Sequence, residues 1–185
     1  INPKSADSFN NLGFIMQKLG DLKKASVFYE KAIQVNFNYA SAHSNLGNIF
    51  NELGENKKAV AFCEQAIQIN PNSASAHNNL GNAFKKLKDT NKAIACYKKA
   101  VQIDPNYSLA NYNIGKIFRE LGKLKEAINF FQKSNLPASK AELLECFYFS
   151  NNLEIYKKVL EKFKKEDSFN LRVATIAAFV SKKEN

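Results

Sequence analysis

The sequence predicts an all-α protein, a solenoid of stacked antiparallel helix pairs. The chain repeats itself every 34 residues, most clearly at four glycines and four alanines: Gly13, Gly47, Gly81 and Gly115, and Ala25, Ala59, Ala93 and Ala127. Within each repeat, apolar residues recur at three- and four-residue spacing, which is the period of one face of a helix. Internal repetition at a period of 20 to 50 residues is typical of repeat arrays, and about 34 residues suits a pair of helices.

The unit from 40 to 73 shows how one repeat is expected to fold. The apolar stripe of its first helix (helix A) consists of His43, Leu46, Gly47 and Phe50. Because Gly47 lacks a side chain, the second helix (helix B) can approach closely, with Ala59 as the small residue opposite. Gly54 and Asn56 break the chain between the two helices, and Pro71 ends helix B. One such pair cannot bury its apolar faces alone, so neighbouring pairs must stack.

The repeat pattern divides the chain into six segments. We expect four repeats at 6–39, 40–73, 74–107 and 108–137, preceded by a helix tail at 1–5 and followed by an atypical segment at 138–185. The start Ile1-Asn2-Pro3 is similar to Ile69-Asn70-Pro71, which places residue 1 inside a repeat and predicts at least one more repeat upstream.

The glycine and alanine marks end after Asn135, but amphipathic segments continue. Three are expected, at 139–150, 153–166 and 170–182, which indicates a degenerate helical hairpin and one further helix. The segment is either a cap, in which Phe147, Phe149 and Tyr156 cover the apolar end, or a junction to a downstream domain. Arrays cut in this way expose apolar ends, so end-to-end self-association is also expected.

Composition limits the class of protein. The 185 residues are 45% hydrophobic, and 27 Lys and Arg against 17 Asp and Glu give a net charge of +10. A charge of this size makes acidic proteins, nucleic acid and anionic membranes candidate partners. The three cysteines, Cys63, Cys96 and Cys146, are too few and too scattered for a disulfide framework or a zinc site, which favours a reducing, cytoplasmic location. No apolar run is long enough to span a bilayer, so no membrane partner is expected.

The glycine and alanine pair, with leucine, an aromatic residue and proline at fixed offsets, resembles the tetratricopeptide repeat family from about Ala6 to Asn135. The run 76–82 (AHNNLGN) is close to the repeats of O-linked N-acetylglucosamine transferases. Three positions depart from the pattern: Phe37 replaces proline, Lys88 the glycine between the helices, and Ser134 the last alanine. The resemblance implies a right-handed superhelix whose A helices line a concave groove for a protein or peptide.

A column of asparagines marks this groove. The residue two positions before the repeated glycine is an asparagine in all four repeats: Asn11, Asn45, Asn79 and Asn113. The residue directly after the glycine is Asn48 in the second repeat, Asn82 in the third and Lys116 in the fourth. An asparagine amide offers a hydrogen-bond acceptor and two donors, which complement a peptide backbone. The column resembles the asparagine ladder of those transferases, which holds peptides by their backbones. The alternative interpretation is a polar groove face that is only hydrated, which would show the same asparagines.

Secondary groove candidates are Asn78, Lys85, Tyr112 and Arg119. Lys85, Lys116 and Arg119 lie on A helices, so they favour acidic partners. No basic residue occupies the groove positions Asp7, Ser41, Ser75 and Leu109 or Asn10, Ser44, Asn78 and Tyr112, which disfavours the carboxylate clamp of chaperone-binding members of the family.

No catalytic, metal or cofactor motif is recognisable. His43 and His77 lie on different helices without a carboxylate or thiolate at ligand spacing, so packing roles are expected. The leading hypothesis is therefore a non-catalytic protein–protein interaction module that binds an extended peptide. A second is a substrate-recruiting or oligomerising accessory domain of a larger enzyme, such as a glycosyltransferase. RNA binding, as in related hairpin repeats, is disfavoured because the basic residues are largely on the convex side.

Overall fold

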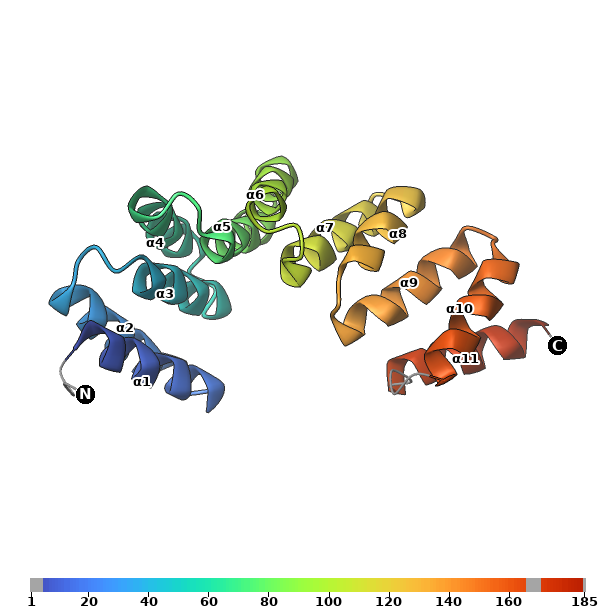
Figure 1. Ribbon diagram of the computed structural model, residues 1–185, viewed down its shortest axis with the longest axis horizontal. Coiled ribbons are helices and arrows are strands. Elements are labelled where there is room, and N and C mark those ends of the chain that lie inside the picture. Colours follow the sequence, from blue (N-terminus) through green and yellow to red (C-terminus); the bar gives the residue numbers. More distant parts are fainter. Residues whose placement is uncertain (1–4, 166–170, 185) are drawn as a thin grey trace. The chain divides into compact units, whose positions relative to one another are not determined.

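The computed structural model describes residues 5–165 and 171–184, and every regular element in these two ranges is a helix (Figure 1). The chain forms two compact units, residues 1–105 and 106–185. The first unit contains α1 (Ala6–Lys18), α2 (Leu22–Val35), α3 (Ala40–Glu52), α4 (Asn56–Ile69), α5 (Ala74–Lys86) and α6 (Thr90–Ile103). The second contains α7 (Ser108–Glu120), α8 (Leu124–Lys133), α9 (Pro137–Phe149), α10 (Leu153–Lys165) and α11 (Leu171–Glu184).

In the first unit, the helices pack as three consecutive pairs, α1 with α2, α3 with α4 and α5 with α6. Helix α2 also packs on α3, and α4 on α5, so each pair is stacked on the next. The A helices α1, α3 and α5 contact one another in that order. Side chains from neighbouring pairs share one core, in which Tyr29 and Ile49 are fully buried. This is the stacking that the repeat predicted.

In the second unit, α7 pairs with α8, and α9 packs against both. Helices α10 and α11 each pack against α9. The core of this unit contains Phe131, Phe147, Tyr156 and Phe163. Phe147 and Tyr156 are buried, whereas Phe149, the last residue of α9, is 65% exposed.

Three of the four repeated glycines lie under an aromatic side chain of the paired B helix, and Gly47 lies under the thiol of Cys63. A Cβ atom on Gly81 would lie 2.6 Å from Cε1 of Tyr97, and Gly13 and Gly115 face Tyr29 and Phe131 at 2.7 Å. A Cβ on Gly47 would lie 2.6 Å from Sγ of Cys63 and 3.3 Å from the carbonyl oxygen of Ala59. The glycine therefore makes room chiefly for the side chain one turn beyond the repeated alanine, and only secondarily for the alanine itself.

One turn type joins helix A to helix B in every pair. Gly20, Gly54 and Gly122 have φ angles of 81°, 82° and 72°, and Lys88 and Asn151 take the same left-handed conformation at 64° and 58°. In the third pair, Lys88 N donates to Lys85 O and Asp89 N to Phe84 O, at 3.0 and 2.9 Å. These two bonds cap the carbonyl end of the helix. The same turn between α9 and α10 is consistent with the predicted degenerate hairpin. Residues 1–4 of the helix tail predicted at 1–5, and residues 166–170, lie outside the described residues.

Replacing Lys88 by glycine should stabilise the protein by about 1 kcal/mol, because a left-handed backbone costs a residue with a Cβ atom about that much and costs glycine nothing. The free energy of unfolding in urea measures the change. The matched control is Gly54→Lys, since nothing lies within 4 Å of a Cβ atom at Gly54. That variant should lose a similar amount, and a gain in both variants, or a loss in both, would contradict the prediction.

Candidate functional site

Five of the predicted asparagines lie on the A helices of the first unit, and we call them the A-helix face: Asn11, Asn45, Asn48, Asn79 and Asn82. Asn11 on α1 is exposed, and the other four are partly buried. Helix α3 contacts both α1 and α5, so the three helices that carry these side chains are neighbours.

The column asparagines of α3 and α5 are hydrogen-bonded to the preceding A helix. The Nδ2 atom of Asn45 donates to Oδ1 of Asn10 at 3.0 Å. That of Asn79 donates to the carbonyl oxygen and the hydroxyl of Ser44, both at 3.2 Å. These bonds connect neighbouring repeats, so the column has a structural role that its sequence pattern did not reveal. They also hold the two amides in defined orientations.

The asparagines that follow the glycines are also engaged. Nδ2 of Asn48 donates to Oε1 of Glu52 at 2.8 Å, and the same oxygen accepts a bond of 2.8 Å from Gln17 on α1. Oδ1 of Asn82 accepts a bond of 2.8 Å from the hydroxyl of Tyr97. These partners orient the amides of Asn48 and Asn82 in the folded protein.

Asn78 does not belong to the accessible surface, because it is only 2% exposed. A neighbouring residue that the sequence did not single out, Asn51, is 4% exposed and donates its Nδ2 to the carbonyl oxygen of Asn79 at 2.9 Å. The remaining secondary candidate of this unit, Lys85, is partly buried on α5.

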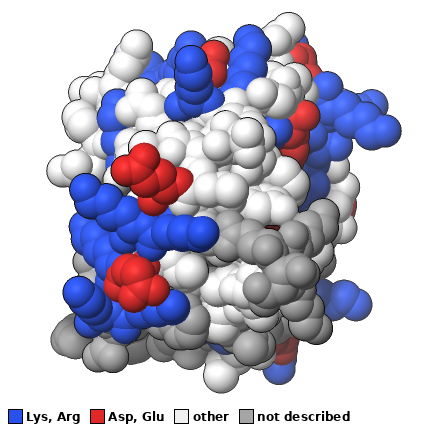
Figure 2. All heavy atoms as spheres, turned by 90° about the vertical axis from the view of Figure 1, so that its right-hand side faces the viewer, with Lys and Arg blue, Asp and Glu red and all other residues white. Residues whose placement is uncertain are grey.

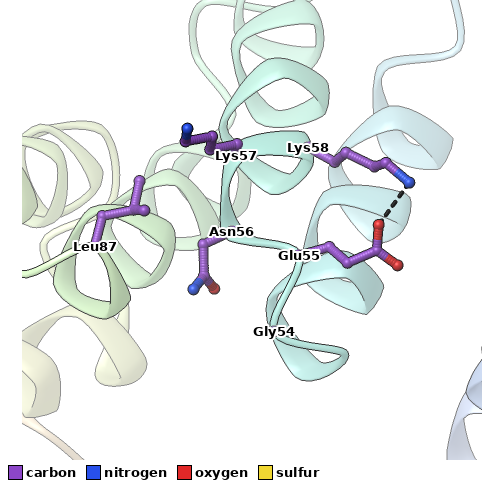
Figure 3. Close-up of a pocket in the computed structure, with 6 residues that line it drawn as sticks. All are labelled: Gly54, Glu55, Asn56, Lys57, Lys58 and Leu87. Atoms are coloured by element: carbon purple, nitrogen blue, oxygen red, sulfur yellow. Dashed lines mark ion pairs between the residues drawn. The ribbon is translucent and has the colours of Figure 1, made fainter.

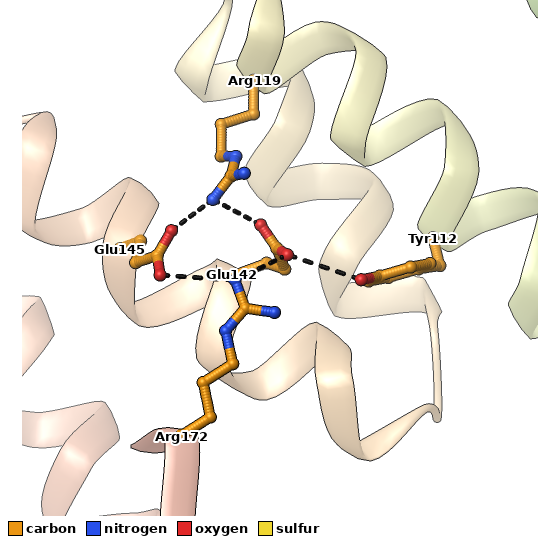
Figure 4. Close-up of polar contacts among 5 residues, drawn as sticks. All are labelled: Tyr112, Arg119, Glu142, Glu145 and Arg172. Carbon is orange, nitrogen blue, oxygen red and sulfur yellow. Dashed lines mark hydrogen bonds and ion pairs between the residues drawn. The ribbon is translucent and has the colours of Figure 1, made fainter. Parts of the chain in front are cut away.

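The fourth-repeat candidates lie on α7 in the second unit. Asn113 and Lys116 are partly buried, and the ammonium group of Lys116 lies 5.6 Å from the ring centre of Tyr112. Arg119 forms ion pairs with Glu142 and Glu145 on α9 (Figure 4). Its charge is therefore balanced within the protein, which weakens the expectation that it attracts an acidic partner.

Arg119 belongs to a cluster of charges that joins three helices. Glu142 is 1% exposed and pairs with Arg119 at 2.5 Å and with Arg172 of α11 at 2.9 Å. Glu145 also contacts both arginines, and the Tyr112 hydroxyl donates to Oε1 of Glu142 at 3.4 Å (Figure 4). Two carboxylates face two guanidinium groups, so the cluster is neutral. No short-range sequence signal predicts it, because its bonded pairs are 23 to 30 residues apart.

Family models of this kind of repeat match the chain. Two tetratricopeptide repeat (TPR) models match residues 74–107 and 96–129, and a TPR repeat model matches 17–54 and 47–88. Together they cover residues 17–129, more than half of the chain. The chain belongs to the tetratricopeptide repeat family. No curated protein sequence gives a significant match.

Solved TPR structures share this fold. A thermophilic TPR protein of Thermus thermophilus has 17% identity and a TM-score of 0.74, with 94% of this chain and 97% of that chain covered. PilF of Pseudomonas aeruginosa has 22% identity and a TM-score of 0.80, with 97% and 86% covered. YrrB, described as a TPR protein with an unusual peptide-binding site, has 20% identity and a TM-score of 0.64, with 96% and 94% covered. At these identities the likeness concerns the fold.

TPR proteins are in general non-catalytic scaffolds, and their fold implies a protein–protein interaction module in general. Among the described residues, no helix is both long and apolar enough to cross a membrane. Nor do the described histidine, cysteine and acidic side chains gather into a group of three that could hold a metal ion.

Both histidines of the TPR array have structural partners. Nε2–H of His43 donates to the carbonyl oxygen of Phe37 at 2.8 Å, and Nε2–H of His77 donates to that of Pro71 at 3.1 Å. Each bond ties the start of an A helix to the loop before it. His43 is also packed between the rings of Phe37 and Phe62, at 5.6 and 6.1 Å.

The cysteines are not activated nucleophiles. Burial raises the pKa of Cys63 to about 12 and the pKa values of Cys96 and Cys146 to about 11. The thiols therefore remain protonated at neutral pH, and only a thiolate is a strong nucleophile.

A shallow hollow of about 370 Å³ lies beside the turn from α3 to α4 (Figure 3). It is lined by residues 54–58 and by Leu87, and Lys58 at its edge pairs with Glu55 at 2.5 Å. Figure 2 shows another face of the molecule, on which basic side chains surround an uncharged area with acidic side chains among them. Such a dispersed distribution is typical of a solvated surface.

Proposed function

We propose that this TPR array binds an extended polypeptide segment of a partner protein along its A-helix face, chiefly through the peptide backbone. The observation that carries the proposal is the orientation of Asn45 and Asn79, each of which uses an amide N–H to bond the preceding helix. A side chain that is already ordered loses less conformational entropy when a ligand binds. The Oδ1 atom of each amide, and the second N–H of Asn45, remain for a ligand.

The spacing of the A helices suits an extended chain. Packed helices lie about 8 to 10 Å apart, and an extended peptide advances about 3.3 Å per residue. One asparagine can therefore meet about every third peptide unit. Each hydrogen bond contributes about 0.5 to 1.5 kcal/mol net, so the affinity is modest and depends little on the ligand's side chains.

The charge distribution in the first unit supports recognition of the backbone. Helices α2, α4 and α6 carry eight lysines and two glutamates. The A helices α1, α3 and α5 carry three lysines and two acidic residues, so they are close to neutral. In this proposal, Lys85 in the first unit, and Lys116 beside Asn113 in the second, supply the preference for acidic segments.

Peptides selected from a random 12-residue display library on the purified chain provide the ligands for the test, and fluorescence anisotropy measures their affinities. Asn11→Ala and Asn48→Ala should each weaken binding about five-fold, which corresponds to one hydrogen bond of about 1 kcal/mol. Their melting temperatures should stay unchanged, because Asn11 is exposed and Asn48 bonds within its own helix. Asn45→Ala should weaken binding and also destabilise the protein by about 1 kcal/mol.

The matched control is Gln34→Ala, which removes an exposed amide from α2 and should leave the affinity unchanged. Methylation of the peptide's backbone nitrogens should reduce binding to the wild-type chain. Peptides that bind Asn11→Ala and Asn48→Ala as well as the wild type, and that tolerate this methylation, would refute recognition by the A-helix face.

A further inference from the structure

A cleft of about 440 Å³ opens on the first unit between α4, α5 and α6. Its apolar lining comes from Ile67, His77, Leu80, Ala95 and Cys96, and its edges carry Glu64 and Gln68 on α4 and Lys99 on α6. The cleft is separate from the A-helix face, since none of the asparagines of that face lines it.

The repeats themselves explain why the cleft exists. The position of Cys96 is a phenylalanine in the other three repeats: Phe28, Phe62 and Phe130. In the second repeat, the Phe62 ring stacks on Phe50 at 5.3 Å and lies 6.1 Å from the His43 ring. In the fourth, Phe130 stacks on Phe118 at 5.6 Å. Only in the third repeat is the ring replaced by a thiol.

The histidine next to this position is more exposed in the third repeat, where the phenylalanine ring is absent, than in the second. His43, covered by Phe62 and Phe37, is 1% exposed, whereas the equivalent His77 is only partly buried and lines the cleft. Burial raises the pKa of Cys96 to about 11, so its thiol is neutral and contributes an uncharged wall. The cleft thus lies where the other repeats have a phenylalanine ring, and the histidine that neighbours this ring in the second repeat lines the cleft as His77.

The charge of α6, at one edge of the cleft, indicates which kind of residue lies next to an aromatic ring that a partner inserts there. Helix α6 carries three lysines and no acidic residue. Lys92 pairs with Asp89 at its start, whereas Lys99 is exposed in its second half and lies at the edge of the cleft. An acidic residue beside the inserted ring would complement Lys99.

We propose that this cleft binds an aromatic side chain of a partner protein, adjacent to an acidic residue, in the place that phenylalanine fills in the other repeats. The ring packs against His77 and Leu80, as the Phe62 ring lies beside His43 in the second repeat. The acidic residue lies over Lys99. The site adds a contact that is specific for a side chain to an array whose A-helix face is proposed to bind chiefly the peptide backbone.

Proton NMR tests the site directly, because the chain has two histidines and their ring signals can be told apart by mutating one. The probe is the blocked peptide acetyl-Phe-Asp-Gly-amide, with Ala in place of Phe, or Lys in place of Asp, as matched probes. The Phe-Asp peptide should shift the His77 signals saturably and leave those of His43 in place. The Ala peptide should bind at least about ten-fold more weakly, since burial of the ring is lost, and the Lys peptide should also bind more weakly.

The decisive variant is Cys96→Phe, which supplies the missing ring. It should raise the melting temperature and abolish the His77 shift, and Cys96→Leu provides a second way to fill the cleft. Asn11→Ala should leave the shift intact, which separates this site from the A-helix face. The proposal is overturned if the Phe-Asp peptide leaves His77 unmoved, if the shift persists in both filled variants, or if Cys96→Phe lowers the melting temperature.

Discussion

Replacing Arg119 by methionine should destabilise the second unit by about 3 kcal/mol. Glu142 is 1% exposed, and removing one partner of a buried ion pair typically costs about 3 to 5 kcal/mol because the remaining charge has lost its compensation. We expect the lower end of this range, since Arg172 still pairs with Glu142 at 2.9 Å. Urea unfolding followed by circular dichroism measures the loss, and hydrogen exchange should show faster opening of α9 and α11.

A double-mutant cycle with Glu142→Gln identifies the cause. In that background, Arg119→Met should cost only about 1 kcal/mol, because no buried charge is left uncompensated. Lys125→Met on α8 is the matched control for removing a charge at an exposed position, and it should change stability by less than about 0.5 kcal/mol. An equal cost of Arg119→Met in both backgrounds would show that Glu142 is not what the arginine stabilises.

Replacing Gly81 by leucine should destabilise the first unit by about 2 kcal/mol, although local preference points the other way. Leucine is favoured over glycine in a helix by about 1 kcal/mol. The new Cβ atom, however, would lie 2.6 Å from Cε1 of Tyr97, which is fully buried and cannot move aside. Forcing extra atoms into a packed core costs about 3 kcal/mol at the upper end of the usual range. The sign of the change in unfolding free energy therefore shows which effect dominates.

Ala61→Leu adds a leucine side chain at an exposed position of α4 and should change stability by less than about 0.5 kcal/mol. Combining Gly81→Leu with Tyr97→Ala should cost less than the sum of the two single changes, because the alanine opens space for the leucine. A stabilised Gly81→Leu variant, or strictly additive costs, would contradict close contact between α5 and α6 at this glycine.

Much of the fold could be predicted from local sequence. The 34-residue period, the helical spacing of apolar residues and the breaks at Gly54 and Pro71 predict the helix pairs, and the structure has them. These signals act over one or two turns of chain, so they are readable without tertiary contacts. Even the irregular turn at Lys88 could be found, since it departs from glycine at a repeated position.

The candidate site was only partly predictable. The asparagine column is visible as a repeat, but its bonds to the preceding helix are not, because Asn45 and Asn10 are 35 residues apart. Asn78 and Asn79 are adjacent and chemically identical, yet one is 2% exposed and the other lies on the A-helix face. Which of the two is buried depends on the helices that pack around α5.

The sequence by itself determined the array: its repeat, its helix pairs, its family and the polar character of its A helices. Only the tertiary structure decided that Arg119 belongs to a neutral cluster with Glu142, and that His77 and Cys96 line a cleft. The physical reason is distance along the chain. Helix formation and repeat spacing depend on neighbours in sequence, whereas burial, ion pairing and unfilled space depend on side chains that only packing brings together.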